Sequence, residues 1–356
     1  MTKVNRLLAE IENKADGILI SSDVNRLYFT DFEYSDGYLL ITPKKSYLIT
    51  DFRYIEAAEK QVSGYFKKIM FKGFSDVQFL QMLKENNISR LMFEDTRMTC
   101  AEYEKFKKQL DGITLVPSGD IIENLRLTKD ETEAQKVIKA QDIAEKSLAN
   151  LIDRFDKNMT EQELATYLEY LMKRNGADGI SFSTIAVSGK ASSLPHGVPR
   201  NQRLENGFLT IDFGAVYKGY HSDMTRTFCI GKATDEMKTV YNTVLEAQTA
   251  AINTIMNGER NCFEIDRIAR EYIYSKGYKG CFGHGLGHGV GLEIHEAPRL
   301  SPSVNKELCL TEGNIVTVEP GIYIEDKFGV RIEDMIYMSP NGPINITKMP
   351  KNLIEL

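Results

Sequence analysis

The chain has 356 residues, of which 42% are hydrophobic and 26% are charged, a balance typical of a globular protein with a full core. The net charge is −6, the isoelectric point is about 5.6 and there is no long basic run, so we expect neither a nucleic-acid nor a membrane partner. No apolar run approaches the length of a membrane span. The length predicts two domains, or one large domain and a smaller one.

The first part of the chain alternates short helical and extended patterns, which predicts an α/β domain over residues 1–125. Its start is an amphipathic helix pattern in which Val4, Leu7, Leu8 and Ile11 recur on one face. This start lacks the apolar region of a signal peptide. The expected strands are 17–20, 26–30, 38–42 and 46–50, and further helices are expected near 75–86 and 101–110.

The second part, residues 126–356, begins with a long run of good helix formers from Asp130, with acids at its start. Thr160 and Glu163 then form a capping-box signature for another helix, which Gly176 ends. Strands and helices alternate after that, so this domain is predicted to be of the α+β class. The expected helices are 234–257 and 262–276, and the expected strands are 180–187, 208–213, 223–230, 314–320 and 330–338.

Two aspartates lie eleven positions apart in the segment FLTIDFGAVYKGYHSDMTRTF. If the turn between its strand-like runs centres on Tyr217–Lys218, Asp212 and Asp223 face each other with Cβ atoms about 5 Å apart. Carboxylates this close repel each other unless a proton or a cation lies between them, so the pair indicates a site for a hard divalent cation. The alternative is two surface aspartates beside a hairpin, which the apolar flanks disfavour.

Two glutamates repeat this arrangement in IVTVEPGIYI and GVRIEDMIYM, two strand-like runs joined through EDKFG. Glu319 precedes Pro320, which cannot donate a ladder hydrogen bond, so the strand is expected to end there at the rim of a site. Taken alone, Glu319 or Glu333 is more typical of an ordinary structural residue than of a metal ligand.

All five histidines lie between His196 and His295, and three of them fall in FGHGLGHGVGLEIHEAP. Glycine takes every second position from residue 283 to 291, so an extended chain places His284 and His288 together on the face opposite the glycines. Four residues of strand span about 13 Å, so we expect one imidazole to bind metal and the other to serve the substrate. Structural histidines are the alternative, which so many histidines among glycines disfavour.

Together these segments resemble a metallopeptidase family, that of prolidase, aminopeptidase P and methionine aminopeptidase, which is known for the pita-bread fold. The resemblance rests on D-x10-D, GHGxGHxxGLxxHExP, VEPGIY and VRIED, and it covers nearly the whole chain. It implies a creatinase-like N-terminal domain, residues 1–125, and a pita-bread catalytic domain, residues 126–356. It also implies a complete set of five metal ligands, which match Asp212, Asp223, His288, Glu319 and Glu333.

By resemblance, Asp223 and Glu333 bridge two divalent ions, Asp212 holds one ion, and His288 with Glu319 completes the other. A carboxylate-rich site favours manganese, with cobalt or zinc as substitutes. The family's chemistry implies that a bridging hydroxide on the two ions attacks the carbonyl of an Xaa-Pro bond.

In this scheme Glu319 carries the proton from the water to the proline nitrogen, and His295 stabilises the oxyanion. His196 and His284 match catalytic positions that line the substrate pocket. Tyr323 and Arg331 match positions that hold the carboxylate ligands in place.

Arg299 directly follows the histidine motif. Some prolidases carry an arginine here that is thought to pair with the free carboxylate of a dipeptide, and a guanidinium suits that role because it binds carboxylates bidentately. An exposed loop arginine is the alternative.

The resemblance therefore implies an enzyme that hydrolyses the bond before proline in small peptides with proline at the second position. Arg299 favours an Xaa-Pro dipeptidase (prolidase), and aminopeptidase P, acting on longer peptides, stays the alternative. The N-terminal domain disfavours methionine aminopeptidase, and the five ligands disfavour both creatinase and a non-catalytic binding protein on the same fold. We expect a homodimer by resemblance, and a cytoplasmic one because the five scattered cysteines indicate reduced thiols.

Overall fold

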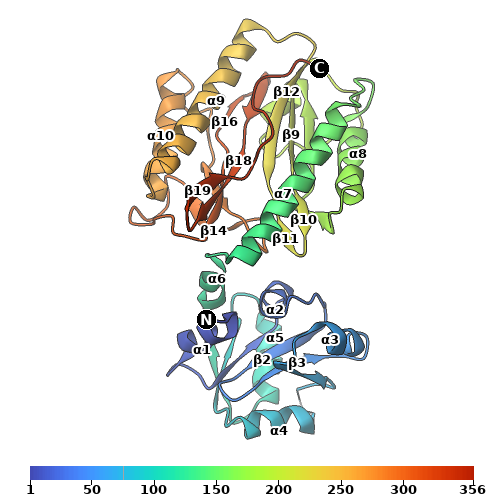
Figure 1. Ribbon diagram of the computed structural model, residues 1–356, viewed down its shortest axis with the longest axis vertical. Helices are drawn as coiled ribbons and strands as arrows, with labels where there is room; N and C mark the ends of the chain where they lie inside the picture. The colour runs from blue at the N-terminus through green and yellow to red at the C-terminus, as the bar shows by residue number, and fades with distance from the viewer. Residues whose placement is uncertain (75) are drawn as a thin grey trace. The chain divides into compact units, whose positions relative to one another are not determined.

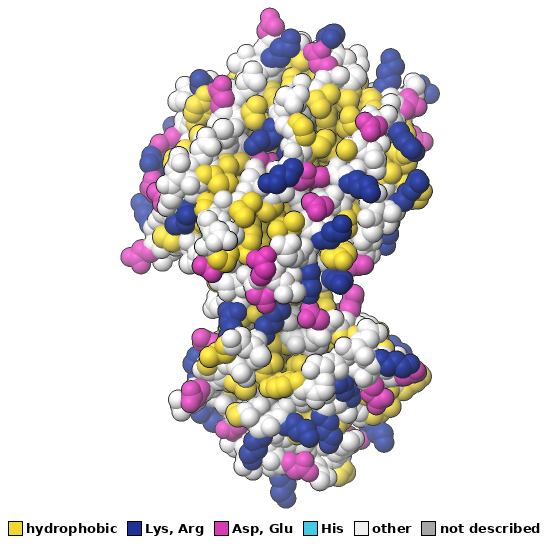
Figure 2. All heavy atoms as spheres, in the orientation of Figure 1, with side chains coloured by type: hydrophobic (Ala, Val, Ile, Leu, Met, Phe, Trp, Pro, Cys, Tyr) yellow, Lys and Arg dark blue, Asp and Glu magenta, His cyan; other side chains and the backbone are white. Residues whose placement is uncertain are grey.

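The computed structural model describes residues 1–74 and 76–356, and the chain divides into two compact units, Met1–Arg126 and Leu127–Leu356. None of the helices in these described ranges is long and apolar enough to cross a membrane. On the face displayed in Figure 2, basic and acidic side chains are interspersed over both units.

The N-terminal unit is an α/β unit in which helices accompany one six-stranded sheet (Figure 1). Its helices are α1 (Lys3–Ile11), α2 (Asp23–Thr30), α3 (Ile55–Gln61), α4 (Val77–Glu85), α5 (Cys100–Gln109) and α6 (Ile121–Arg126). Its strands are β1 (Gly17–Ile20), β2 (Gly37–Ile41), β3 (Ser46–Thr50), β4 (Phe66–Met70), β5 (Arg90–Phe93) and β6 (Thr114–Pro117). The order is β4-β3-β2-β1-β5-β6, with β1, β2 and β3 antiparallel and the outer pairings parallel.

Most of the elements predicted for this unit are confirmed, and one is wrong. The strand expected at 26–30 is instead helix α2. Its apolar run favours a strand locally, but the Glu94 carboxylate accepts hydrogen bonds from the backbone N–H groups of Ser21 (2.5 Å) and Ser22 (2.8 Å) at the start of the helix. A carboxylate at that end stabilises the helix through its unpaired donors and its dipole. The predicted start of α4 at residue 75 lies outside the described residues.

In the second unit, Figure 1 shows strands lying between two pairs of helices. The helices are α7 (Glu131–Ile152) with α8 (Glu161–Arg174), and α9 (Asp235–Met256) with α10 (Cys262–Ser275). Both α7 and α8 begin with a capping box, and the one predicted at Thr160 and Glu163 is confirmed. This arrangement is the α+β layering expected from the sequence.

The strands of this unit form several small sheets. The sheet β12-β9-β8 contains β8 (Ile185–Ser188), β9 (Gly207–Phe213) and β12 (Met224–Ile230), and the sheet β11-β10-β7 contains β7 (Gly179–Ile180), β10 (Ala215–Tyr217) and β11 (Tyr220–His221). The sheet β14-β13-β15-β18-β19 contains β13 (Gly287–Gly289), β14 (Glu296–Leu300), β15 (Ile315–Val318), β18 (Asp334–Ser339) and β19 (Gly342–Asn345). A two-stranded sheet contains β16 (Gly321–Ile324) and β17 (Phe328–Arg331).

The hairpin between the two aspartates turns one residue later than predicted. Tyr217 pairs with Tyr220, so the turn lies at Lys218–Gly219, where both residues have positive φ (49° and 78°). A two-residue turn of this kind needs left-handed backbone at both positions, and glycine supplies it without strain. The predicted opposition of the two aspartates is therefore wrong, because the ladder pairs Asp212 with Thr225 and leaves Asp223 just before β12.

The register of the flanking strands places the two glutamates at opposite positions. The ladders β15–β18 and β16–β17 are in one continuous register, with Val318 paired to Asp334 and Gly321 to Arg331. Two residues interrupt each strand between these pairs, and by count Glu319 faces Glu333. The strand predicted over 314–320 ends before Glu319, as expected, whereas the one predicted over 330–338 is broken at Glu333.

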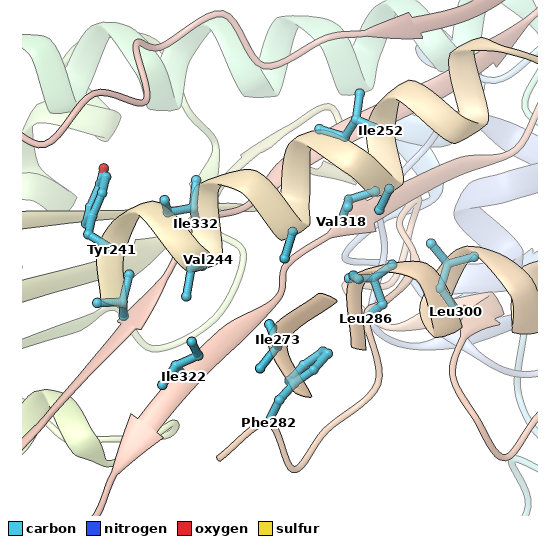
Figure 3. Packing of buried hydrophobic residues seen from close by; sticks show 14 of the residues in the cluster. Tyr241, Val244, Ile252, Ile273, Phe282, Leu286, Leu300, Val318, Ile322 and Ile332 are labelled. Carbon is cyan, nitrogen blue, oxygen red and sulfur yellow. The ribbon is translucent and has the colours of Figure 1, made fainter. Parts of the chain in front are cut away.

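Buried apolar residues of the second unit pack on both sides of this strand break. Figure 3 shows Tyr241 and Val244 of α9 in one cluster with Val318, Ile322 and Ile332. Val318 and Ile322 are fully buried on either side of Glu319. Burial of each such side chain contributes about 1.5–3 kcal/mol. Glu319 is therefore anchored by apolar neighbours although its own carboxylate points into a polar site.

Candidate metal centre and substrate pocket

Four of the predicted ligands converge from separate elements. Ligand atoms of Asp223, His288 and Glu333 all lie within 4.8 Å of one another, and the three residues are buried. Nε2 of His288 lies 3.5 Å from Oδ2 of Asp223 and 3.4 Å from Oε1 of Glu319. The strand ends and breaks thus bring together side chains that are up to 110 positions apart in sequence.

The fifth predicted ligand, Asp212, lines the same cavity as these four residues. Its Oδ2 accepts a 2.5 Å hydrogen bond from Nη2 of Arg331. Its Oδ1 is buried and has no hydrogen-bond partner within the described part of the chain. A buried carboxylate oxygen without a partner is costly, so this oxygen is suited to a cation.

The hydrogen bonds of His288 direct one ring nitrogen toward the carboxylates. Nδ1 lies 3.0 Å from the carbonyl oxygen of Gly289, which can only accept, so Nδ1 carries the proton. Nε2 therefore keeps its lone pair and faces Asp223 and Glu319. Burial lowers the pKa of His288 to about 4, so the ring is neutral near pH 7 and can act as a metal ligand.

The charged form of these buried carboxylates is unfavourable unless a positive charge lies close to them. Burial raises the pKa of Asp223 and of Glu333 well above the ordinary values, and the neighbouring carboxylates raise both further. Burial likewise raises the pKa of Glu319 to about 8, against the opposing effect of Arg331. Crowded oxygens of this kind with one imidazole are the donors that hard divalent ions prefer, so the residues present fit a metal centre.

Two threonines that the sequence analysis did not single out hold the glutamates. The Thr225 hydroxyl donates a 2.7 Å hydrogen bond to Oε2 of Glu333, and the Thr317 hydroxyl donates one of 3.1 Å to Oε1 of Glu319. Thr225 lies two residues after Asp223, and Thr317 two residues before Glu319. Because alternate residues of a strand share one face, this spacing was the available signal.

Arg331 and Tyr323 form a hydrogen-bonded chain next to the predicted ligands. Nη1 of Arg331 donates a 2.7 Å hydrogen bond to the Tyr323 hydroxyl, which lies 3.1 Å from Nε2 of His284. Nδ1 of His284 lies 2.8 Å from the carbonyl oxygen of Gly285 and therefore carries the proton, so Nε2 accepts from the tyrosine. Both ring nitrogens of His284 are thus engaged within the protein.

The predicted close approach at the glycines is confirmed. A Cβ on Gly287 would lie 1.9 Å from the carbonyl oxygen of Thr317, and one on Gly289 would lie 2.2 Å from that of Ala297. The regular strand is shorter than the expected extended segment, because only β13 is paired. These close contacts keep the backbone of β13, which includes His288, next to β15. Glu319 directly follows the last residue of β15.

One cavity of about 540 Å³ adjoins the carboxylates, and every predicted site residue except Tyr323 lines it. Its wall also includes the apolar side chains of Phe182, Val198 and Ile294. Partial burial lowers the pKa of His295, and the positive charge of Arg299 adds to this effect. Within residues 1–74 and 76–356, Arg299 has no hydrogen bond or ion pair, so its guanidinium is available to a ligand.

Residues 135–340 match metallopeptidase family M24, and residues 3–128 match the creatinase/prolidase N-terminal domain. The chain therefore belongs to metallopeptidase family M24, and the expected fold and the expected class of enzyme are both confirmed. The sequence is 38% identical over 347 residues to the Xaa-Pro dipeptidase of Pyrococcus furiosus, covering 96% of both proteins.

Solved structures match over almost the whole chain. The structure is similar to that of the Xaa-Pro dipeptidase from Bacillus anthracis, with a TM-score of 0.92 and 39% identity over 99% of both chains. It is equally similar to an X-Pro aminopeptidase from Thermotoga maritima, with a TM-score of 0.92 and 35% identity over 99% of this chain and 100% of that one.

Proposed function

We propose that this protein is a metal-dependent Xaa-Pro peptidase that acts chiefly as a dipeptidase. The observation that carries the proposal is a buried carboxylate and imidazole cluster in a cavity that also contains Arg299, which has no partner among the described residues. The cavity is of the size that small ligands occupy. The similarity to Xaa-Pro dipeptidases from two organisms supports this substrate class.

Five side chains are proposed to hold two divalent ions, with manganese as the native metal and cobalt or zinc as substitutes. Bound ions of this kind acidify water and polarise a carbonyl group. The proposed ligands are Asp212, Asp223, His288, Glu319 and Glu333. Asp223→Ala or Glu333→Ala is expected to abolish both metal binding and turnover, and wild-type rates in either variant would contradict the assignment.

The chain's own residues are proposed to move the proton and stabilise charge. Glu319 takes a proton from the attacking water and delivers it to the proline nitrogen as the C–N bond breaks, releasing the first amino acid and proline. This donation matters because the proline nitrogen becomes a basic secondary amine on leaving. His295 stands at the cavity wall to stabilise the carbonyl oxygen, and His196 to contact the substrate. His284 is proposed as a further catalytic pocket residue, tied to Tyr323.

Arg299 is proposed to bind the free carboxylate of a dipeptide. Its guanidinium lines the cavity, lacks a partner in the described residues and can bind a carboxylate bidentately. In a longer peptide the proline carboxylate is replaced by an amide, which offers no charge to this group. Arginine therefore favours dipeptides over longer substrates.

The second candidate is an aminopeptidase P activity on longer peptides, which the similarity to the Thermotoga maritima X-Pro aminopeptidase favours. The deciding experiment compares Ala-Pro with Ala-Pro-Pro on chelator-stripped protein with and without manganese. The proposal expects manganese-dependent cleavage of Ala-Pro, and a preference for the tripeptide would support the second candidate. If neither peptide is cleaved with or without manganese, the protein is a binding protein on this fold.

Arg299→Leu gives the matched test of the dipeptide assignment. The KM for Ala-Pro should rise about tenfold to a hundredfold, because a charge-assisted hydrogen bond contributes about 1.5–3 kcal/mol. The KM for Ala-Pro amide, which lacks the carboxylate, should change little. An equal change for both substrates would make Arg299 a bystander.

We further propose that the protein is a cytoplasmic homodimer. The free state of all five cysteines supports a reducing compartment. Sedimentation equilibrium tests the oligomeric state, and a purely monomeric protein would contradict it. The division of the chain into a creatinase-like domain over 1–125 and a catalytic domain over 126–356 is likewise proposed.

A further inference from the structure

A buried ion pair lies behind the loop that carries His295. Nζ of Lys129 lies 2.9 Å from Oε2 of Glu296, and the two side chains are only 2% and 6% exposed. Charges taken out of water are costly to the fold even when they are paired, so a buried pair is weak evidence of a contribution to stability. The position of the Lys129–Glu296 pair next to the loop that carries His295 points to a role other than stability.

The carboxylate of Glu296 closes the loop from residue 291 to residue 296. Its Oε1 accepts a 3.0 Å hydrogen bond from the backbone N–H of Glu293, while its Oε2 holds Lys129. The backbone N–H of Gly291 donates to the carbonyl oxygen of Glu293 at 3.1 Å. One carboxylate therefore fastens the middle of the loop to a lysine from a distant part of the sequence.

The Lys129–Glu296 pair occupies the space that a side chain at Gly291 would fill. A Cβ at that position would lie 2.5 Å from Oε2 of Glu296 and 2.8 Å from Cε of Lys129. Any side chain at residue 291 would push the lysine and the glutamate apart. Gly291, Lys129 and Glu296 therefore pack closely together at the base of the loop.

His295 itself is held by the backbone of this loop. In the described ranges its ring makes no hydrogen bond, and its ring contact is with His288 at a centroid distance of 4.4 Å. The imidazole lines the cavity and is exposed. The position of the ring therefore depends on where Glu296 and Lys129 hold the chain.

We propose that the Lys129–Glu296 ion pair is a positioning device that fixes His295 for catalysis. The inference rests on the proposed function, in which His295 stabilises the carbonyl oxygen. Neither Lys129 nor Glu296 lines the cavity, so both act through the loop. A small displacement of a catalytic group is enough to slow a reaction strongly.

The test compares Lys129→Met, Glu296→Gln and the double variant in the full-length, manganese-loaded protein. Each single variant leaves one buried charge unpaired and can fail to fold, whereas the double variant removes both charges at similar volume. We expect the double variant to lose about tenfold to a hundredfold in kcat for Ala-Pro, the loss typical of a misplaced catalytic group, with KM and bound metal unchanged. Wild-type kcat or a loss of bound metal in the double variant would overturn the proposal.

A double-mutant cycle with His295→Ala separates positioning from general damage. If the ion pair acts through His295, adding Lys129→Met and Glu296→Gln to His295→Ala produces no further fall in kcat. Additive losses would mean that the pair acts elsewhere. Leu148→Ala, on the buried face of α7, serves as the control for destabilisation, and it is expected to keep the wild-type kcat.

A spectroscopic measurement makes the result independent of activity. In zinc-loaded protein, which is diamagnetic, 15N-labelled histidines give ring signals, and the His295 signal is identified by its absence in His295→Ala. The double variant should shift or broaden that signal and leave the His196 signal in place. An unchanged His295 signal would overturn the positioning role, whereas absence of Ala-Pro cleavage by the wild-type protein would overturn the proposed function alone.

Discussion

The hydroxyl of Thr225 donates a 2.7 Å hydrogen bond to Oε2 of Glu333. The same hydroxyl accepts a 3.1 Å hydrogen bond from Nε of Arg331, so its proton is directed toward the glutamate. One small side chain thus orients a proposed metal ligand from a neighbouring strand. The glutamate carboxylate is in turn left with its other oxygen for a cation.

Thr225→Val should therefore weaken metal binding without removing a ligand. Loss of a hydrogen bond that orients a ligand typically costs about tenfold to a hundredfold in metal affinity. Isothermal titration with manganese measures this change directly. Thr225→Ser keeps the hydroxyl and should bind nearly as tightly as the wild-type protein, and equal weakening in both variants would point to packing instead.

Two substitutions of aspartate by asparagine should have opposite effects on the metal-free protein. Asp223→Asn removes a buried carboxyl group whose ionisation burial and the neighbouring carboxylates oppose, and should raise the free energy of unfolding. Asp212→Asn leaves Arg331 without its charged partner and should lower that free energy. Denaturant unfolding of chelated protein measures both, while turnover is lost in each. A fall in stability for both variants would contradict the crowding argument.

Gly287 and Gly283 provide a matched pair of substitutions within one segment. Gly287→Ala places a Cβ 1.9 Å from the carbonyl oxygen of Thr317 and should destabilise the protein by about 3 kcal/mol or more, as overpacking against backbone does. At Gly283 the corresponding Cβ meets no atom of the described residues within 4 Å, so Gly283→Ala should be nearly neutral. Thermal unfolding followed by circular dichroism distinguishes them. Equal melting temperatures would show that β13 can move away from β15.

Glu161 should make stability depend on pH in the acid range. Burial raises its pKa, but hydrogen bonds from Arg200 and Ser188 outweigh this effect and leave the pKa below its ordinary value. A lowered pKa gives stabilisation that is complete above the unfolded pKa of about 4.3 and is lost as pH falls through the folded value. Glu161→Gln should thus cost about 1–3 kcal/mol at pH 7 and progressively less below pH 4.

The matched control for this prediction is Glu169→Gln on the same helix. Glu169 makes no ion pair or side-chain hydrogen bond in the described part of the chain. Its substitution should leave stability unchanged at both pH values. Chelated protein is used throughout, so that metal release at low pH does not enter the comparison. A cost of Glu161→Gln that stays constant from pH 7 to pH 3 would contradict the assignment.

The sequence was sufficient to predict the carboxylates, the histidines and the two arginines that line the cavity, because they occur in short motifs, many of them at strand ends. The sequence was insufficient to predict which residues pair across neighbouring strands. The turn lies one residue later than predicted, at Lys218–Gly219, which moves the partner of Asp212 by two positions, from Asp223 to Thr225. A single-residue shift of this kind depends on backbone conformation in the turn, which the apolar pattern does not encode.

Tertiary contacts explain the other differences. Residues 26–30 have the composition of a strand, yet Glu94 caps a helix there from far along the chain. The Lys129–Glu296 pair joins residues 167 positions apart, and neither belongs to a motif that predicts the other. Contacts of this range arise only when the sheets assemble, so local patterns could not indicate them.

The pairs β15–β18 and β16–β17 share one register, and this limits which insertions and deletions related proteins can carry in the hairpin. Glu319 and Glu333 face each other at the base of one long hairpin, whose tip lies beyond β16 and β17. Residues inserted or lost in equal numbers on the two arms change the length of the hairpin but keep the facing pair. Natural variants should therefore differ freely in the number of residues between these glutamates, whereas a one-sided change would pull a ligand from the metal centre.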